Sequence, residues 1–348
     1  MALTLTDLQA PHGFERLVEA KDQSAGLHAL ICVHSTVLGP AAGGCRMWAY
    51  ASPSEAIRDV TRLARGMTYK NAMADLGLGG GKSVIIGDAR RDKTPDMMRA
   101  FGRAVQLLEG RYFTAEDVGI SPADMAHAAE ETEFAVGLST ASGDPSPWTA
   151  EGVFRCLLVG AQHVFGSNDL QGRRVLVQGL GHVGLSLAEK LHDAGADLIV
   201  TDINPDAVED ARVRLKADVC APDAVFDQQM DIFAPCALGG VLTGDHVARL
   251  TARLVCGAAN NQLATPTVGQ DLISRNITYL PDYVVNAGGI ISVASEIHGT
   301  GNGWRRARLD GIAGRVSQML DRAAQHNRST TEIADEMVET MLARNSAA

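Results

Sequence analysis

The chain has 348 residues, enough for two domains with complete hydrophobic cores, and a formal net charge of −10. That acidic balance argues against nucleic acid or an anionic membrane as the main partner. The six cysteines form no C-x-x-C pair, so zinc or any other bound metal is not expected. The start of the chain lacks a secretory signal, and no apolar run reaches the ~18 residues that span a bilayer. These features predict a soluble, cytoplasmic protein.

A helix is predicted from Ser52 onward in the first part of the chain. Ser52 is its N-cap, Pro53 stands at the first position, and Glu55 completes a capping box. The expected buried stripe consists of Ala56, Val60, Leu63 and Met67. Lys70 falls on the same stripe if the helix extends that far. It either extends to solvent beyond the helix end or points into a cleft to bind an anion.

The segment LGLGGGKSVIIGD, residues 76–88, places Lys82 after three glycines. It is not a phosphate-binding P-loop, because Leu76 stands where that motif needs glycine and a buried strand, Ser83–Gly87, is predicted to follow. Burial and a nearby cation such as Lys70 would lower the pKa of Lys82 and make it a general base.

The segment GRYFTAEDVG adds Glu116 and Asp117 where a strand ends. Asp117 is suited to exchange a proton with a substrate nitrogen. Two cations and a carboxylate fit oxidation of a 2-amino acid, and oxidation of a 2-hydroxy acid stays open as an alternative. The histidines His34, His127 and His298 are expected to be structural or exposed.

The loop at residues 139–149 is predicted to be a hinge, and a dinucleotide motif follows it. A strand, Val175–Gln178, leads into Gly179-x-Gly181-x-x-Gly184, then a helix, then a strand, Leu198–Thr201, that ends at Asp202. An acid at this place binds the ribose hydroxyls and repels a 2′-phosphate, which favours NAD, although Asp202 could also be only a turn residue. Further strands are predicted at Ile232–Pro235, Leu254–Gly257 and Ile277–Leu280, as in a doubly wound parallel sheet.

Eight segments carry a family resemblance: GPAAGGCRMW, ARGMTYKNAMA, LGLGGGKSVIIGD, GRYFTAEDVG, VQGLGHVG, FAPCALGG, GAANNQL and PDYVVNAGG. They occur in the order seen in the glutamate/leucine/phenylalanine/valine dehydrogenases, and the chain most resembles the leucine-specific members. The resemblance implies reversible, NAD-dependent oxidative deamination of an L-amino acid to a 2-oxo acid and ammonium.

The resemblance also implies roles for individual residues. Lys70 would bind the substrate carboxylate, Lys82 would activate water, and Asp117 would transfer the amine proton. The other expected substrate contacts are Gly43, Gly44, Asn260, Ala42, Ala115, Ile290 and Val293. The expected cofactor contacts are Arg46, Thr149, Gly179, Leu180, Gly181, His182, Val183, Gly184, Asp202, Ile203, Ala237, Leu238 and Asn260.

The implied fold is α/β, with a substrate-binding domain at residues 1–142, a Rossmann domain at 143–317 and a cleft between them. The last segment, 318–348, is expected to pack back on the first domain. It contains a predicted helix at residues 329–344, which begins with a capping box from Ser329 to Glu332. A homo-oligomer is expected from the family.

The side-chain pocket decides the substrate. Ala42 stands where glutamate-specific members have lysine, and Val293 stands where they have serine, so glutamate is excluded. Leucine-specific members usually have leucine in place of Ala42 and valine in place of Ile290. The first difference enlarges the pocket and the second reduces it. Leucine or another branched-chain amino acid is preferred, with phenylalanine, tryptophan or another bulky apolar amino acid as the alternative. A non-catalytic NAD-binding sensor is the alternative of another class.

Overall fold

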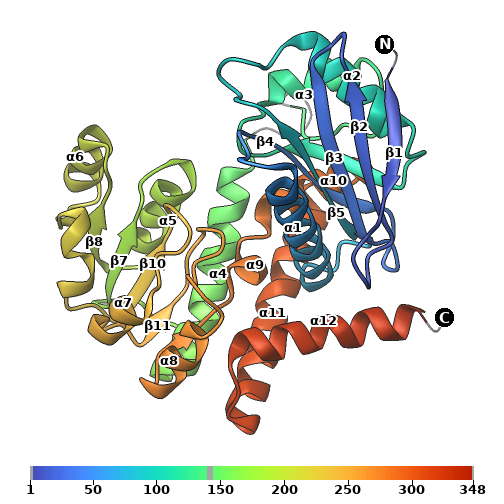
Figure 1. Ribbon diagram of the computed structural model, residues 1–348. Helices are drawn as coiled ribbons and strands as arrows, with labels where there is room; N and C mark the ends of the chain where they lie inside the picture. The colour runs from blue at the N-terminus through green and yellow to red at the C-terminus, as the bar shows by residue number, and fades with distance from the viewer. Residues whose placement is uncertain (1–2, 139–143, 347–348) are drawn as a thin grey trace. The chain divides into compact units, whose positions relative to one another are not determined.

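The computed structural model describes residues 3–138 and 144–346, which form two compact units (Figure 1). Unit 1 contains the described residues up to Asp144, Ile290–Arg305 and the residues from Val338 on. Unit 2 contains Pro145–Gly289 and Arg306–Met337. Residues 139–143 of the predicted hinge lie outside the described residues, and residues 146–149, predicted as hinge, form the first turn of a helix that runs from Ser146 to Phe165.

These boundaries correct two predictions. Residues 318–337 belong to unit 2, so the predicted return to the first domain is wrong for most of its length. The family resemblance predicts residues 290–305 in the Rossmann domain, but they belong to unit 1. They are fastened there by polar contacts: the His298 ring bonds the Leu76 carbonyl at 2.7 Å, and Glu296 accepts from the Gly137 N–H at 3.1 Å.

The sheet of unit 1 has the strand order β1-β2-β3-β5-β4-β6. The strands are β1 (Thr4–Leu8), β2 (Arg16–Asp22), β3 (Leu27–Ser35), β4 (Ala41–Trp48), β5 (Gly79–Ile86) and β6 (Tyr112–Glu116). Neighbours from β1 to β5 are antiparallel, whereas β4 is parallel to both β5 and β6. The carboxyl ends of β4, β5 and β6 therefore lie at one edge of the sheet.

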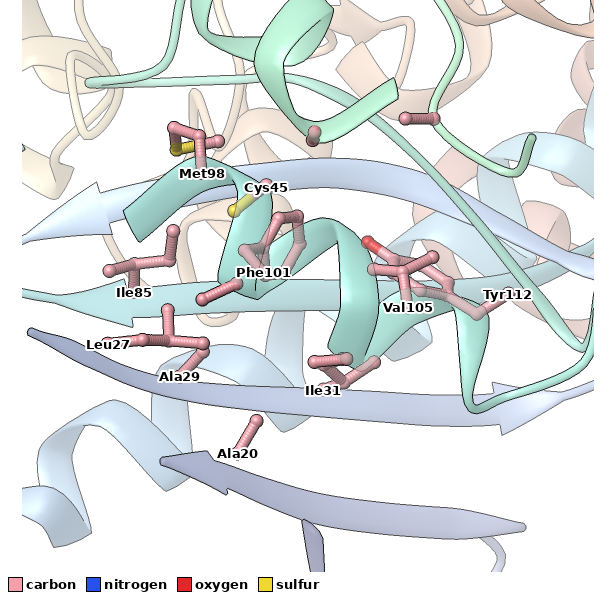
Figure 2. Close-up of a cluster of buried hydrophobic side chains, with 14 of the residues drawn as sticks. Ala20, Leu27, Ala29, Ile31, Cys45, Ile85, Met98, Phe101, Val105 and Tyr112 are labelled. Carbon is pink, nitrogen blue, oxygen red and sulfur yellow. The ribbon is translucent and has the colours of Figure 1, made fainter. Parts of the chain in front are cut away.

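The two faces of this sheet are covered differently (Figure 1). On one face lie α2 (Pro95–Gln106) and α3 (Pro122–Ala129). Figure 2 shows Met98, Phe101 and Val105 of α2 directed at sheet residues such as Ile31 and Ile85. These side chains are fully or almost fully buried, which makes this face the larger core of the unit.

The opposite face carries α1 (Pro53–Met73), which begins at the predicted residue. Ser52 Oγ accepts from the Glu55 N–H at 3.2 Å, as a capping box requires. The Glu55 carboxylate, however, accepts from the N–H of Ala51 at 2.8 Å, so the reciprocal bond to Ser52 that was predicted is not the one formed.

The buried stripe of α1 differs from the predicted one after its first turns. Ala56 and Val60 are buried, and the stripe continues through Ala64. Leu63 and Met67 are only half-buried. They lie on the flank of the helix, together with Lys70, and this flank bears on the site below.

Unit 2 contains a parallel sheet with the order β12-β11-β10-β7-β8-β9. Its elements up to residue 285 are α4 (Ser146–Phe165), β7 (Arg174–Gln178), α5 (His182–Asp193), β8 (Asp197–Thr201), α6 (Pro205–Arg214), β9 (Asp218–Val219), a 3-10 helix η1 (Pro222–Asp227), β10 (Ile232–Pro235), α7 (Gly244–Arg249), β11 (Leu254–Val255), α8 (Val268–Ser274), β12 (Thr278–Tyr279) and α9 (Asp282–Val285). Successive residues of β11 face opposite sides: Leu254 meets Gly160 of α4, and Val255 joins the cluster of α7 and α8. The predicted doubly wound sheet is confirmed, although β11 and β12 are shorter than expected and β9 was not predicted.

The chain ends in α10 (Gly288–Ile297), α11 (Asn302–His326) and α12 (Thr330–Ser346). The predicted capping box of α12 is confirmed: Ser329 N–H donates to Glu332, and Glu332 N–H donates to Ser329 Oγ, both at 3.1 Å. Among the described residues, no helix is both long and apolar enough to cross a membrane.

Candidate active site

Lys82 lies inside β5, not ahead of a strand that starts at Ser83 as predicted. Its backbone is packed tightly, since a Cβ added to Gly80 would approach the Thr68 nitrogen of α1 to 2.1 Å. Glycine is required there because α1 lies directly on the strand. The Lys82 side chain is 7% exposed, and its Nζ lies 2.8 Å from Asp117 Oδ2. Its immediate charged neighbour is therefore a carboxylate.

Asp117 follows β6 and is the centre of the charged cluster in unit 1. Burial by itself would raise the pKa of this carboxyl, but the charges of Lys82 and Arg46 outweigh that effect and lower the pKa below its ordinary value. The neighbouring Glu116 behaves in the opposite way, because burial and the charges of Asp144 and Asp117 raise its pKa. Of the two adjacent acids, Asp117 is the one held ionised by direct cation partners.

Arg46, on β4, joins Asp117 to a second acid. Its Nε donates to Asp117 Oδ2 at 3.2 Å, and a terminal nitrogen donates to Asp59 Oδ2 at 3.1 Å. Burial opposes the charged guanidinium, yet Asp117 and Asp59 together raise the pKa of Arg46. The predicted cofactor contact of Arg46 stays a prediction, whereas these two ion pairs are part of the structure.

Lys70 is half-buried and lies within α1, which runs on to Met73. The interpretation in which the helix ends before this lysine is therefore wrong. Met67, one turn earlier on the same flank, has its Cγ 3.0 Å from the position that a Cβ on Gly43 would occupy. The flank of α1 that carries Lys70 thus adjoins the glycines of β4.

The next residue, Asn71, fastens the strands beneath this flank. Its buried amide donates to the carbonyls of Ala42 at 3.2 Å and Gly79 at 2.5 Å. Ala42 is itself fully buried and presents no accessible surface. A larger side chain at this position would have to displace its neighbours.

Two of the predicted pocket residues converge on Gly137. A Cβ built there would lie 3.4 Å from Ala115 Cβ and 3.8 Å from Val293 Cγ2. Ala115 is almost fully buried, and Val293 and Ile290 are half-buried on α10. Ala115 and Val293 therefore form a small apolar wall beside Gly137 in unit 1.

The glycine motif in unit 2 packs closely against its strand and leaves the start of α5 open. A Cβ on Gly184 would come within 1.9 Å of the Gly179 carbonyl oxygen, so the third glycine permits close packing of helix on strand. The N-cap of α5, Gly181, makes no side-chain cap, and the space around its Cβ position is open to 4 Å. The first N–H groups of α5 are thus suited to an anion.

Asp202 stands where β8 ends, beside this loop. Its Oδ2 accepts from the Leu180 N–H at 2.5 Å, and Oδ1 accepts from the Asn204 N–H at 2.8 Å. Asp202 therefore stabilises the turn that follows β8. Each carboxylate oxygen can accept a further bond, so a role with a ribose is compatible with these contacts.

The remaining predicted cofactor residues are also in unit 2. His182 and Val183 begin α5, and Ala237 packs against Gly179. Ile203 and Leu238 are exposed apolar side chains close to the ends of β8 and β10. Asn260 accepts from Asn286 Nδ2 at 2.9 Å. Thr149, on α4, packs against Gly288 and Gly289.

Sequence reasoning missed Asp59 and Gly137. Asp59 was detectable, because it precedes Leu63 by four residues and Lys70 by eleven and so shares their helical face. Gly137 carried no sequence signal, since only the fold brings it between Ala115 and Val293. Within the part of the chain that the structure describes, no group of three or more His, Cys, Asp or Glu residues is placed to hold a metal.

Comparison with known proteins decides the family. The description "Glu/Leu/Phe/Val dehydrogenase, dimerisation domain" matches residues 14–134, and "Glutamate/Leucine/Phenylalanine/Valine dehydrogenase" matches residues 202–345. The leucine dehydrogenase of Thermoactinomyces intermedius is 46% identical over 97% of this chain and 93% of its own. The chain belongs to the Glu/Leu/Phe/Val dehydrogenase family. It is an amino-acid dehydrogenase, an oxidoreductase.

Members with different names are also similar. The phenylalanine dehydrogenase of Caldalkalibacillus thermarum is 42% identical over 94% of this chain and 91% of its own. The crystal structure of the L-tryptophan dehydrogenase from Nostoc punctiforme superposes with a TM-score of 0.87 at 36% identity, covering 96% of this chain and 97% of that one. The predicted family and fold are confirmed, and the names of the relatives span branched-chain and aromatic substrates.

Proposed function

We propose that the protein catalyses the reversible, NAD-dependent oxidative deamination of an L-amino acid, with leucine and other branched-chain amino acids preferred. The observation that carries the proposal is the buried Lys82–Asp117 pair, with Nζ and Oδ2 2.8 Å apart, in a chain that retains Lys70 on the adjoining helix. A protein that only senses NAD has no need for a desolvated ion pair of this kind.

Each of the three residues has a task in this reaction. Lys70 binds the substrate α-carboxylate as a charge partner. Asp117, ionised before substrate binds, takes a proton from the substrate ammonium group and so frees the amine lone pair. After the Cα hydride has left, Lys82, having passed its own proton to solvent, takes a proton from water as the water oxygen bonds to Cα of the iminium. Asp117 then returns its proton to the substrate nitrogen. As the C–N bond breaks and ammonia leaves, the hydroxyl proton passes to solvent and the 2-oxo group forms.

The dehydrogenases of this family use a pyridine nucleotide. Bound at the motif of unit 2, the nicotinamide would supply the acceptor for the Cα hydride. The N-terminus of α5 would hold the pyrophosphate, and Asp202 would accept from the adenosine ribose hydroxyls. A 2′-phosphate would meet the Asp202 carboxylate, so NAD is proposed over NADP.

The apolar wall of Ala115 and Val293 suits a hydrocarbon side chain. Burying a distal carboxylate against it would leave that charge unpaired. Leucine is the first candidate substrate, because two leucine dehydrogenases, each 46% identical to this chain, are among its most similar relatives. The second candidate is a larger apolar amino acid such as phenylalanine or tryptophan, which the names of other relatives support.

We further propose that the protein acts as a homo-oligomer, since the matched description of its first part is that of a dimerisation domain. Size-exclusion chromatography with light scattering would test this. A monomeric mass over the working concentration range would refute it.

The test of function is a panel of 2-oxo acids, each with ammonium and either NADH or NADPH, followed by loss of absorbance at the reduced cofactor. We expect the highest kcat/KM with 4-methyl-2-oxopentanoate or 3-methyl-2-oxobutanoate and NADH. Turnover that does not depend on ammonium would favour a 2-hydroxy acid dehydrogenase. NADH binding without turnover of any 2-oxo acid would favour the sensor.

A further inference from the structure

A second acid lies behind the catalytic pair and has no task in the mechanism above. We propose that Asp59 is a positioning residue: it holds the Arg46 guanidinium so that Arg46 fixes the orientation of the Asp117 carboxylate beside Lys82. The inference rests on the proposed function, in which Asp117 moves the amine proton.

The contacts form an unbroken series. Asp59 Oδ2 lies 3.1 Å from a terminal nitrogen of Arg46, and Arg46 Nε lies 3.2 Å from Asp117 Oδ2. The same Asp117 oxygen lies 2.8 Å from Lys82 Nζ. Because the guanidinium is rigid and planar, an anchor at its terminal nitrogen also sets the direction of its Nε–H bond.

Asp59 is itself held in place on its other side. The Tyr50 hydroxyl donates to Oδ2 at 2.8 Å, and an Arg62 nitrogen donates to Oδ1 at 2.9 Å. Burial works against ionisation, but these two bonds, with the charge of Arg46, lower the pKa of Asp59 below its ordinary value. Asp59 and Arg46 have side chains only 18% and 21% exposed, so solvent screens their interaction weakly.

Asp59 and Lys70 belong to the same face of α1. Eleven residues complete about three helical turns, so the two Cα positions are separated by about 16 Å along the helix axis. Lys70 is proposed to bind the substrate carboxylate, and Asp59 acts on the group that takes the amine proton. Helix α1 therefore links the residue that binds the substrate carboxylate to the residue that positions the acceptor of the amine proton.

A purely structural ion pair between β4 and α1 would show the same distances, so the test must separate the two roles. The charged groups that face Asp117 are Lys82 from β5, Arg46 from β4 and its neighbour Glu116 from β6. In Asp59→Asn a negative charge is lost and Arg46 pairs with Asp117 alone. The pKa of Asp117 then falls in either role, because a nearby negative charge is gone. A positioning role also lowers kcat at the pH plateau, whereas loss of a purely structural ion pair would lower stability and leave that plateau near the wild-type value.

The experiment measures kcat and KM for oxidative deamination against pH in wild type and Asp59→Asn. We expect kcat to fall by about 10-fold to 100-fold, as for a misplaced catalytic group, with KM for the amino acid changed by less than about threefold. The acid limb of the kcat profile should move to lower pH by about half a unit or more. A plateau kcat near the wild-type value, or an acid limb that stays in place or moves upward, would overturn the proposal.

Three further variants make the result specific. Arg58→Gln removes an exposed charge on the same helix, one position before Asp59, and should leave the profile unchanged. The double variant Arg46→Lys with Asp59→Asn should have a kcat close to that of Arg46→Lys alone, because Asp59 acts through Arg46. Losses of kcat that add up from the two single variants would overturn the proposal. Should Asp59→Asn fail to fold, Asp59→Glu retains the charge and should keep the acid limb of wild type with a lower kcat, and a shifted limb there would overturn it too.

These outcomes differ from a failure of the proposed function, which would appear as inactive wild-type protein in the 2-oxo acid panel. If the wild type is active and the Asp59 variants have the kcat and pH profile of wild type, only the positioning role is rejected.

Discussion

Replacing Lys82 by alanine removes the partner that lies 2.8 Å from Asp117. The variant should still bind NAD, because the dinucleotide motif is in the other unit. Its kcat for oxidative deamination should fall by about 10²–10⁴, the usual contribution of a positioned acid–base group. KM for the amino acid should change far less, since Lys70 remains.

The loss of unfolding free energy in Lys82→Ala depends on which partners Asp117 still has. Removing one member of a buried pair costs about 3–5 kcal/mol when the other charge is left alone. Here Arg46 still donates to Asp117, and the carboxylate is 25% exposed, so we expect a smaller cost of about 2–3 kcal/mol. For a unit of this size that corresponds to a fall in apparent Tm of about 4–12 °C.

The stability change should also depend on pH. The folded-state pKa of Asp117 is lowered, so its pairing stabilises the fold above the unfolded-state pKa of about 3.9 and is lost as pH falls through the folded value. Wild type and Lys82→Ala should therefore differ most at neutral pH, and their Tm values should converge below about pH 4.

The assay is steady-state kinetics with thermal unfolding, and Lys190→Ala is the matched control. Lys190 pairs with Glu151 at 2.8 Å in unit 2 and has no proposed role in catalysis. The control should lose a little Tm, because a partly exposed ion pair contributes little to stability. It should keep kcat within about twofold, because the catalytic pair belongs to unit 1, whereas Lys190 belongs to unit 2. Near-wild-type turnover by Lys82→Ala would remove Lys82 from the mechanism. Loss of NAD binding would show that the variant fails for another reason.

Three other predictions test separate parts of the site. Lys70→Ala should raise KM for the amino acid, by an amount that corresponds to about 2–5 kcal/mol of lost binding free energy if the charge pair with the carboxylate is desolvated. An unchanged KM in initial-rate assays would show that Lys70 does not bind the substrate carboxylate. NAD should exceed NADP in kcat/KM by at least about 10-fold, and Asp202→Ser should narrow that ratio by removing the charge that opposes a 2′-phosphate; an unchanged ratio would leave Asp202 as a turn residue alone. Ala42→Leu should lower Tm, since about three carbons enter a fully buried position, and should lower kcat/KM for phenylalanine more than for valine; equal losses would place Ala42 outside the side-chain pocket.

Local pattern was enough to predict the features that depend on neighbours in the chain. Turn chemistry and short-range periodicity predict the N-cap Ser52, the glycine motif and the two strands around it. Those strands are predicted at Val175–Gln178 and Leu198–Thr201, and each begins one residue earlier in the structure. The position of Asp117 where a strand ends follows from the same rules. The strand that contains Lys82 is predicted to begin at Ser83, but in the structure it begins at Gly79. Glycines lower strand propensity, so only pairing with β3 and β4 brings Gly79–Gly81 into the sheet.

Tertiary structure decided what the charged residues touch. Sequence alone suggested a cation beside Lys82, whereas parallel pairing of β4 with β5 and β6 brings Arg46, Lys82 and Asp117 into one series of ion pairs. It also decided that residues 290–305 belong to unit 1, through contacts of His298 and Glu296 with segments more than 150 positions away. Such contacts depend on the fold of both partners, so no local window of sequence carries them. The chain by itself determined which chemical groups are present and on which elements, and the packing of those elements determined which groups meet.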